Sequence, residues 1–275
     1  MSEQRGLGAP DKIKILLYHR ISDKGDDHWT VSSYRFRQQL EYLVRTNYTA
    51  ISFQDYLLFE QGELNLPKRP IVLTFDDGYS DLHRHAFPLM REYGMKGVIF
   101  ALGDRSIHRN TWDTDVEFTR HTLLSDEQIL EMQEAEFEIG SHSLTHRRLT
   151  HLTKHEAWDE ISRSRMALEM LLNSPVRSFS YPFGLVNSGV KSLVQEAGYR
   201  IGCSAWSGPL TFGADLLENR RILVRGGIGL AAFAASLTLP YRAYRWMVWK
   251  LKHRPGPRLH RYVEQPNGLV SPEQI

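Results

Sequence analysis

The sequence predicts an α/β protein in which helices surround a closed or nearly closed barrel of parallel strands. Short runs rich in β-branched and aromatic residues alternate with longer segments whose apolar residues recur at helical spacing. This alternation gives about seven or eight strand-and-helix units, a number that favours a barrel over an open sheet. The 275 residues, of which 41% are hydrophobic, are enough to bury its core.

Eight segments have the composition of strands, and amphipathic segments separate most of them. The expected strands are 14–19, 48–53, 71–75, 96–102, 137–142, 176–184, 199–206 and 220–226. The expected helices are 34–46, 54–60, 82–94, 125–135, 150–172 and 190–198. Capping residues begin two of these helices: Ser125 with Gln128, and Thr153 with Glu156.

The chain divides into three parts by composition. Residues 1–12 form an N-terminal tail, 13–228 the barrel, and 229–275 a basic, aromatic extension. The single cysteine, Cys203, excludes an internal disulfide framework and any zinc site built from several cysteines. The first residues lack the apolar stretch of a secretory signal, so we expect a cytoplasmic protein.

Four polar motifs stand where expected strands end: LLYH, TFDDG, GSHSLTH and SYPFG. In a parallel barrel the functional side chains lie at the C-terminal ends of the strands. We therefore expect these four motifs to share one site. The loop 103–115, with His108, Trp112 and Asp113, is either a lid over that site or an ordinary surface loop.

Two adjacent acids, Asp76 and Asp77, follow the apolar run IVLTF. Charge at the end of a buried strand is costly unless it is paired or bound to a metal. His142 and His146 have the spacing of one helical turn, and a carboxylate such as Asp77 would complete a two-histidine, one-carboxylate metal site. Asp76 would then remain free as a general base that deprotonates water.

The motifs TFDDG, SHSLTH and SYPFG, in this order, resemble those of the polysaccharide deacetylase family, the NodB-like carbohydrate esterases of the family 4 type. The resemblance covers roughly residues 13–225. It implies a distorted (β/α)7-type barrel with the NodB homology fold. Enzymes of this family use a divalent metal to remove N- or O-acyl groups from sugars. Zinc is the metal expected first, with Co2+, Ni2+ or Fe2+ as alternatives.

The same resemblance implies roles for individual residues. Asp76 is expected to be the catalytic base, and the metal ligands are expected to be Asp77, His142 and His146. The third motif is expected to form a groove wall and to offer the backbone N–H of Phe183 to an oxyanion. The residues of this wall are Tyr181, Pro182 and Phe183.

The sequence departs from the family pattern at two positions. Many members carry an arginine that orients the base where this chain has Ser180, and Arg220 or Arg221 is expected to supply that charge instead. Members also usually carry a Leu-x-His general acid on the last strand, where this chain has Arg225. His19, at the end of the first strand, is either the replacement acid or a structural histidine.

The segment from Asn219 to Val263 contains no Asp or Glu but ten Arg or Lys residues, interleaved beyond residue 240 with tyrosine and tryptophan. Such a segment either lies on an anionic membrane or packs as a basic helix against the barrel. We expect no nucleic-acid partner, because no nucleic-acid-binding fold accompanies the charge.

Together these features predict a metal-dependent hydrolase that removes an N-acetyl group from an amino sugar. A cytoplasmic enzyme would act on a glycan precursor, either lipid-linked or nucleotide-linked, and the membrane alternative for the extension would place it at the inner face of the membrane. Two rival functions stay open. One is hydrolysis of a non-sugar amide, and the other is glycan binding by a pseudoenzyme with weak or no catalysis.

Overall fold

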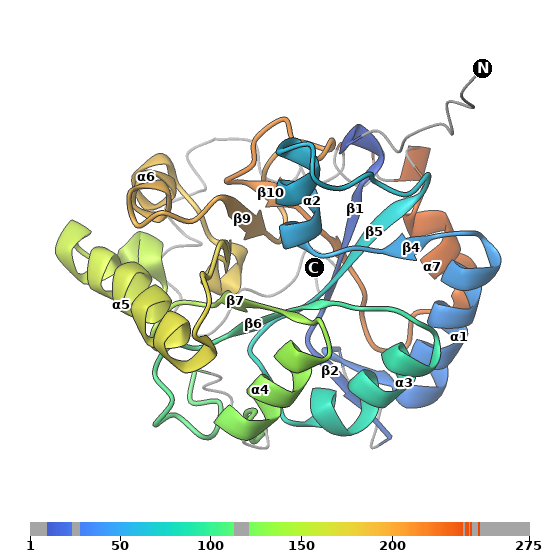
Figure 1. Ribbon diagram of the computed structural model, residues 1–275, viewed down its shortest axis with the longest axis horizontal. Helices are drawn as coiled ribbons and strands as arrows, with labels where there is room; N and C mark the ends of the chain where they lie inside the picture. Colours follow the sequence, from blue (N-terminus) through green and yellow to red (C-terminus); the bar gives the residue numbers. More distant parts are fainter. Residues whose placement is uncertain are drawn as a thin grey trace.

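A nearly closed parallel barrel forms the centre of the protein (Figure 1). The computed structural model describes residues 10–23, 28–112 and 121–238, together with the single residues 240, 241, 243 and 247. Within these residues nine strands form one sheet in the order β10-β9-β8-β7-β6-β5-β1-β11, and β4 pairs with β5. The strand pairings in this sheet are parallel. The expected α/β barrel is therefore confirmed.

The strands of this sheet are short. Their bounds are β1 Lys14–Tyr18, β4 Thr49–Ala50, β5 Pro70–Phe75, β6 Val98–Ala101, β7 Glu138–Ser141, β8 Ser178–Ser180, β9 Ile201–Ser204, β10 Asn219–Arg220 and β11 Ile222–Leu223. A second, two-stranded sheet of β2 (Arg20–Ser22) and β3 (Thr30–Ser32) follows β1. The sequence pattern does not predict this small sheet, because its strands have only three residues each.

The barrel closes through the chain segment that carries β10 and β11. We predicted one final strand over 220–226, but the segment splits at Arg221. Its first part, β10, pairs with β9 at one edge of the sheet, and its second part, β11, pairs with β1 at the other edge. Arg221 therefore lies at the seam, where the backbone itself joins the two edges.

Most of the helices lie around the outside of the strands (Figure 1). Their bounds are α1 Ser33–Arg45, α2 Phe53–Glu60, α3 Phe87–Glu92, α4 Asp126–Glu134, α5 Lys154–Leu172, α6 Ser188–Glu196 and α7 Leu230–Ser236. Short helical turns occupy η1 Pro10–Lys12, η2 Leu82–Ala86, η3 Leu149–His151 and η4 Pro182–Gly184.

Local capping decides where several helices begin. Both predicted capping boxes are present, at Ser125 with Gln128 before α4 and at Thr153 with Glu156 before α5. A third box, which we did not predict, begins α2 at Ser52. Because this cap makes Phe53 the first helical residue, the predicted strand 48–53 is reduced to β4.

The helix predicted over 82–94 also differs from the structure. Its first turn, η2, is a π-helix, and only Phe87–Glu92 are α-helical. Pro88 lies in the first turn of α3, where its missing N–H is tolerated.

Alternate residues of the strands belong to two separate hydrophobic clusters, one outside and one inside the barrel. Leu73 and Phe75 of β5 belong to the outer cluster, which also contains residues of α1 and α5, whereas Val72 belongs to the inner cluster with Phe100. Phe53 and other residues of α2 join the inward cluster and fill the barrel interior. Thr74 and Asp76 share the inward parity of Val72, so the sheet directs Asp76 into the barrel.

The described start of the C-terminal extension packs against the barrel. Phe233 of α7 is fully buried, and its ring centroid lies 6.1 Å from that of Tyr42 on α1. Most of the extension lies outside the described residues, including its basic residues, its tryptophans and the LKH sequence at 251–253. No helix in the described part of the chain is long and apolar enough to cross a bilayer.

Candidate metal centre

The turn after β5 presents Asp76 and Asp77 to different neighbours. The Asp76 N–H continues the sheet by donating to the Tyr18 carbonyl at 3.0 Å. Asp77 and Gly78 then adopt left-handed backbone conformations, with φ of 71° and 68°. A side chain at position 78 would be strained by this φ, and its Cβ would lie 3.5 Å from the Ala101 backbone. Glycine therefore lets the chain turn sharply and separate the two carboxylates.

The loop after β7 carries both histidines of the second motif. We predicted that one helical turn aligns them, and this explanation is wrong: residues 142–148 are not helical. Instead Ser143 and His146 have left-handed φ values of 65° each, and the Ser143 hydroxyl accepts the His146 N–H at 3.0 Å. Buried Glu160 of α5 accepts the backbone N–H of Thr145 at 2.9 Å and its hydroxyl at 2.5 Å, which anchors the loop.

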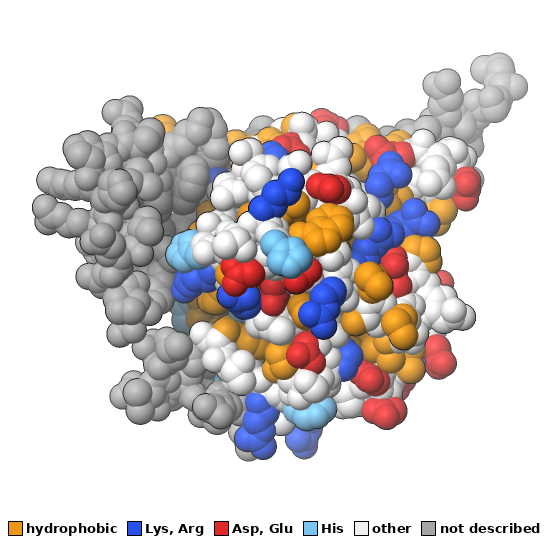
Figure 2. Space-filling model, turned by 90° about the vertical axis from the view of Figure 1, so that its left-hand side faces the viewer, with side chains coloured by type: hydrophobic (Ala, Val, Ile, Leu, Met, Phe, Trp, Pro, Cys, Tyr) orange, Lys and Arg blue, Asp and Glu red, His pale blue; other side chains and the backbone are white. Residues whose placement is uncertain are grey.

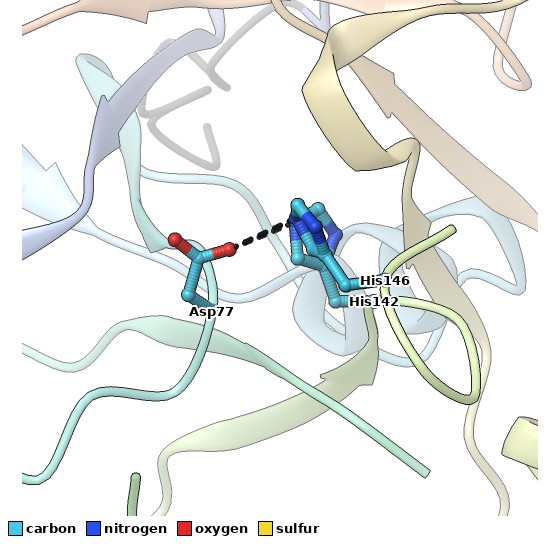
Figure 3. A group of neighbouring side chains, drawn as sticks. All are labelled: Asp77, His142 and His146. Atoms are coloured by element: carbon cyan, nitrogen blue, oxygen red, sulfur yellow. Dashed lines mark ion pairs between the residues drawn. The ribbon is translucent and has the colours of Figure 1, made fainter. Parts of the chain in front are cut away.

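Asp77, His142 and His146 converge on one point (Figure 3). Asp77 Oδ1 lies 3.2 Å from Nε2 of each histidine, all three side chains are buried, and their ligand atoms lie within 4.8 Å of one another. Ligands that hold one zinc ion at about 2.0–2.2 Å are spaced in this way. The residues therefore fit a divalent metal.

Hydrogen bonding prepares His142 to act as a ligand. Its Nδ1 donates to the Ser180 carbonyl at 2.8 Å, so Nε2, which faces Asp77 and carries a proton in the metal-free protein, is the nitrogen that would bind a metal after losing that proton. Burial raises the pKa of Asp77, but hydrogen bonds from His142 and His146 outweigh burial and hold this pKa well below its usual range. Asp77 is thus charged, as a metal ligand must be.

Asp76 is held as a carboxylate by Arg221. The Arg221 guanidinium donates to both carboxylate oxygens, at 2.6 and 2.7 Å, and both side chains are almost fully buried. Burial raises the pKa of Asp76, but the positive charges of Arg221 and His142 outweigh it and leave this pKa below its usual value. Of the two arginines left open by the sequence, Arg221 makes these bonds.

Ser180 and Thr74 complete the surroundings of Arg221. Its Nη2 donates to the Ser180 hydroxyl at 2.9 Å, and that hydroxyl lies 3.1 Å from Asp76. Its Nη1 also donates to the Thr74 hydroxyl, and its Nε donates to the Ser204 carbonyl. The serine at the position where many family members carry arginine therefore helps to bind an arginine that arrives from the seam.

His19 lies next to this network, as the strand order requires. Residue 19 directly follows β1, whose Tyr18 carbonyl accepts the Asp76 N–H. Its ring packs on Trp29 with centroids 4.6 Å apart, and its buried Nδ1 has no hydrogen-bond partner among the described residues. Burial lowers the pKa of His19, against the opposing charges of Asp77 and Asp76.

The third motif contributes less side-chain surface than the sequence predicted. Tyr181 is fully buried in the core and donates its hydroxyl to the Leu217 carbonyl at 2.7 Å, so its side chain does not line a groove. Pro182 is also buried. Phe183 has a left-handed φ of 58°, which turns its ring toward His146, with the two centroids 4.6 Å apart.

Two further residues complete this wall beside His146. The Trp112 indole stacks on the His146 ring at 4.3 Å, so this part of the 103–115 loop, for which the sequence left a lid and an ordinary surface loop open, contacts the site. The Arg148 guanidinium lies 3.9 Å from the centre of the Phe183 ring. Nothing in the sequence distinguished Arg148 from the neighbouring Arg147. Asp113 lies outside the described residues.

Comparison with known proteins agrees with this geometry. The sequence model of the family described as polysaccharide deacetylase matches residues 63–202. YxkH of Bacillus subtilis (strain 168), whose name places it among the polysaccharide deacetylases, is 26% identical over 226 residues, covering 82% of this chain and 76% of YxkH. The poly-β-1,6-N-acetyl-D-glucosamine N-deacetylase of Staphylococcus aureus (strain N315) is 21% identical, covering 77% of this chain and 73% of that protein.

Solved structures show the same fold. The polysaccharide deacetylase BC0361 of Bacillus cereus has a TM-score of 0.68 at 26% identity, covering 82% of this chain and 69% of that chain. The Streptococcus pyogenes deacetylase PplD, solved with acetate, has a TM-score of 0.71 at 22% identity and covers 84% and 100% of the two chains.

The parallel barrel and the Asp–His–His cluster at the ends of its strands place the protein in the class of barrel enzymes that have a candidate metal-binding site. The family model covers half of the sequence, and the related proteins are deacetylases. The chain belongs to the polysaccharide deacetylase family.

Proposed function

We propose that this protein is a metal-dependent hydrolase that removes the N-acetyl group from an amino sugar. The main support for the proposal is that the adjacent carboxylates of Asp76 and Asp77 have different partners. Asp77 converges with His142 and His146, whereas Asp76 is held charged by Arg221 at the edge of the same cluster. Related proteins named as deacetylases support the acyl group as the target.

The cluster of Asp77, His142 and His146 would hold the cation. A divalent metal bound there would act as a Lewis acid that polarises a carbonyl and makes a water molecule more acidic. Imidazole and carboxylate donors suit Zn2+ first, and also Co2+, Ni2+ or Fe2+.

The other residues would move protons and stabilise charge. Asp76 would take a proton from the attacking water, and Arg221 would keep Asp76 ionised and oriented for that transfer. The Phe183 N–H would donate to the oxyanion that forms when the amide carbonyl is attacked. His19 would deliver a proton to the departing amine.

Removal and replacement of the metal test this function. We expect the purified protein to contain about one divalent ion and to release acetate from N-acetylglucosamine oligomers. A chelator should abolish acetate release, and Zn2+ or Co2+ should restore it. Metal-dependent hydrolysis of simple amides without hydrolysis of sugars would favour the rival amidohydrolase function, and binding of glycans without any release would favour the pseudoenzyme.

The Arg221 contact weakens the case for a pseudoenzyme. One reason for that alternative was the missing arginine of the third motif, and the structure supplies a guanidinium to Asp76 from the seam. The other reason, the missing Leu-x-His, stays open because His19 is only a proposed substitute.

For the substrate we propose a glycan precursor at the inner face of the membrane, lipid-linked rather than nucleotide-linked. The support is the composition of the extension after Thr238, which is rich in Arg, Lys, Tyr and Trp. The face shown in Figure 2 mixes acidic and basic side chains, so this face presents no uniformly basic surface to an anionic lipid.

Sedimentation with vesicles tests this placement. We expect the full chain to sediment with phosphatidylglycerol vesicles at low salt and not with phosphatidylcholine vesicles. A chain that ends at Thr238 keeps the buried Phe233 of α7 and should stay in the supernatant. Equal, negligible sedimentation of both chains would contradict the proposal.

A further inference from the structure

An arginine that neither the family motifs nor the proposed mechanism uses lies beside the candidate metal centre. The guanidinium of Arg148 lies 3.9 Å from the centre of the Phe183 ring, and the Phe183 ring lies 4.6 Å from that of His146. Arg148 is therefore two ring contacts away from a proposed metal ligand, and it follows His146 by only two residues. It belongs to the wall that any substrate at the centre would meet.

The charge of Arg148 has no acidic partner among the described residues. No ion pair or side-chain hydrogen bond of the described chain involves its guanidinium, although the side chain is half-buried. Burial lowers the pKa of Arg148, and no carboxylate within the described ranges offsets this effect. The adjacent Arg147 differs in both respects: it is exposed and forms an ion pair with Glu156 at 3.1 Å.

The contact of the guanidinium carbon with the Phe183 ring does not itself use the N–H groups of Arg148. An arginine that stacks on an aromatic ring contacts it with one flat face, while its N–H groups point outward in the plane. Those N–H groups match the two oxygens of a carboxylate or a phosphate. Phe183 thus acts as a platform that fixes a bidentate anion donor near the site of acyl transfer.

We propose that Arg148 is a specificity-determining residue that selects acylated amino sugars carrying an anionic group, a carboxylate or a phosphate, close to the acyl-bearing ring. This inference rests on the proposed function, because it assigns the substrate class of the same site. A partly desolvated cation with no acidic partner in the described part of the chain favours binding of an anion, whereas a neutral glycan would leave it unpaired. Lipid-linked and nucleotide-linked sugars carry phosphate, and acidic sugars carry carboxylate, so the chemistry admits both sources.

Kinetics with three probes distinguish the sources. The probes are the methyl glycoside of N-acetylglucosamine, N-acetylglucosamine 1-phosphate and N-acetylmuramic acid, which are neutral, phosphorylated and carboxylated. We expect the wild-type protein to favour one anionic probe over the neutral one in kcat/KM. In Arg148→Met the ratio of anionic to neutral kcat/KM should fall about tenfold to a hundredfold, mainly through KM.

Matched variants separate recognition from structural support. Arg148→Lys keeps the charge but loses the planar fork, so it should recover only part of the ratio. Arg147→Met removes an equal charge one residue away and should leave the ratio unchanged, because Arg147 is exposed and already paired. The wild-type preference should also weaken with added salt.

Binding measurements keep the inference distinct from the proposed function. Titration calorimetry with the same probes should show Arg148-dependent affinity for an anionic probe even if no acetate is released. Such a result would support the role of Arg148 and contradict the proposed hydrolase function. Equal losses for neutral and anionic probes in Arg148→Met would overturn the inference. A wild-type protein without any preference for an anionic probe would also overturn it.

Discussion

Replacing Asp76 by asparagine should reduce kcat for acetate release by roughly 10²- to 10⁴-fold while the bound metal is retained. The amide cannot accept a proton from water, but it has nearly the same shape as the carboxylate. Because Asp77, His142 and His146 are the residues that converge, the metal content should stay near that of the wild-type protein. Kinetics on protein of measured metal content check this result.

Two further variants separate loss of the general base from loss of the metal and from a general loss of negative charge. Asp77→Asn should lose the metal as well as the activity, because it removes the carboxylate that faces both imidazoles at 3.2 Å. Asp159→Asn, which changes a partly exposed acid on α5 near His155, should alter neither quantity. If Asp76→Asn kept more than about a tenth of the wild-type kcat, Asp76 would not be the general base.

Replacing Arg221 by methionine should cost about 3–5 kcal/mol in the free energy of unfolding. The change leaves the Asp76 carboxylate buried without its two charged hydrogen bonds, and it also removes donors to Thr74 and Ser180. Urea unfolding of metal-free protein at pH 7 gives the measurement. Arg37→Met removes a pair of bonds with similar distances to Glu92 at the surface and should cost less than about 1 kcal/mol.

The pH dependence of this loss has a defined sign. In the metal-free wild-type protein the pKa of Asp76 is depressed, so its pairing contributes stability that is present above the unfolded pKa and disappears as the pH falls through the folded pKa. In Arg221→Met burial raises the pKa of Asp76, and protonation then removes the unpaired charge. The deficit of the variant should therefore be largest at neutral pH and shrink toward pH 4. A deficit independent of pH would show that packing alone explains the loss.

The general location of the site follows from the sequence because parallel strands end together. TFDDG, SHSLTH and SYPFG each end a buried run, and the structure brings all three together at one end of the barrel. The two capping boxes were equally predictable, since each depends on residues three positions apart. The loop that joins His142 to His146 was not predictable from spacing, because its shape depends on two left-handed residues and on Glu160 of another element.

By itself the sequence determined the barrel class, the capped starts of α4 and α5 and the set of residues that converge at the candidate metal centre, since these depend on periodicity and short-range chemistry. Only the tertiary structure decided that Arg221, and not Arg220, contacts Asp76, and that Arg148 stacks on Phe183 while Arg147 pairs with Glu156. Adjacent residues of the same type have nearly the same local sequence environment, so the sequence does not distinguish their contacts. Their roles differ because strand register at the seam and packing between distant loops set which direction each side chain takes.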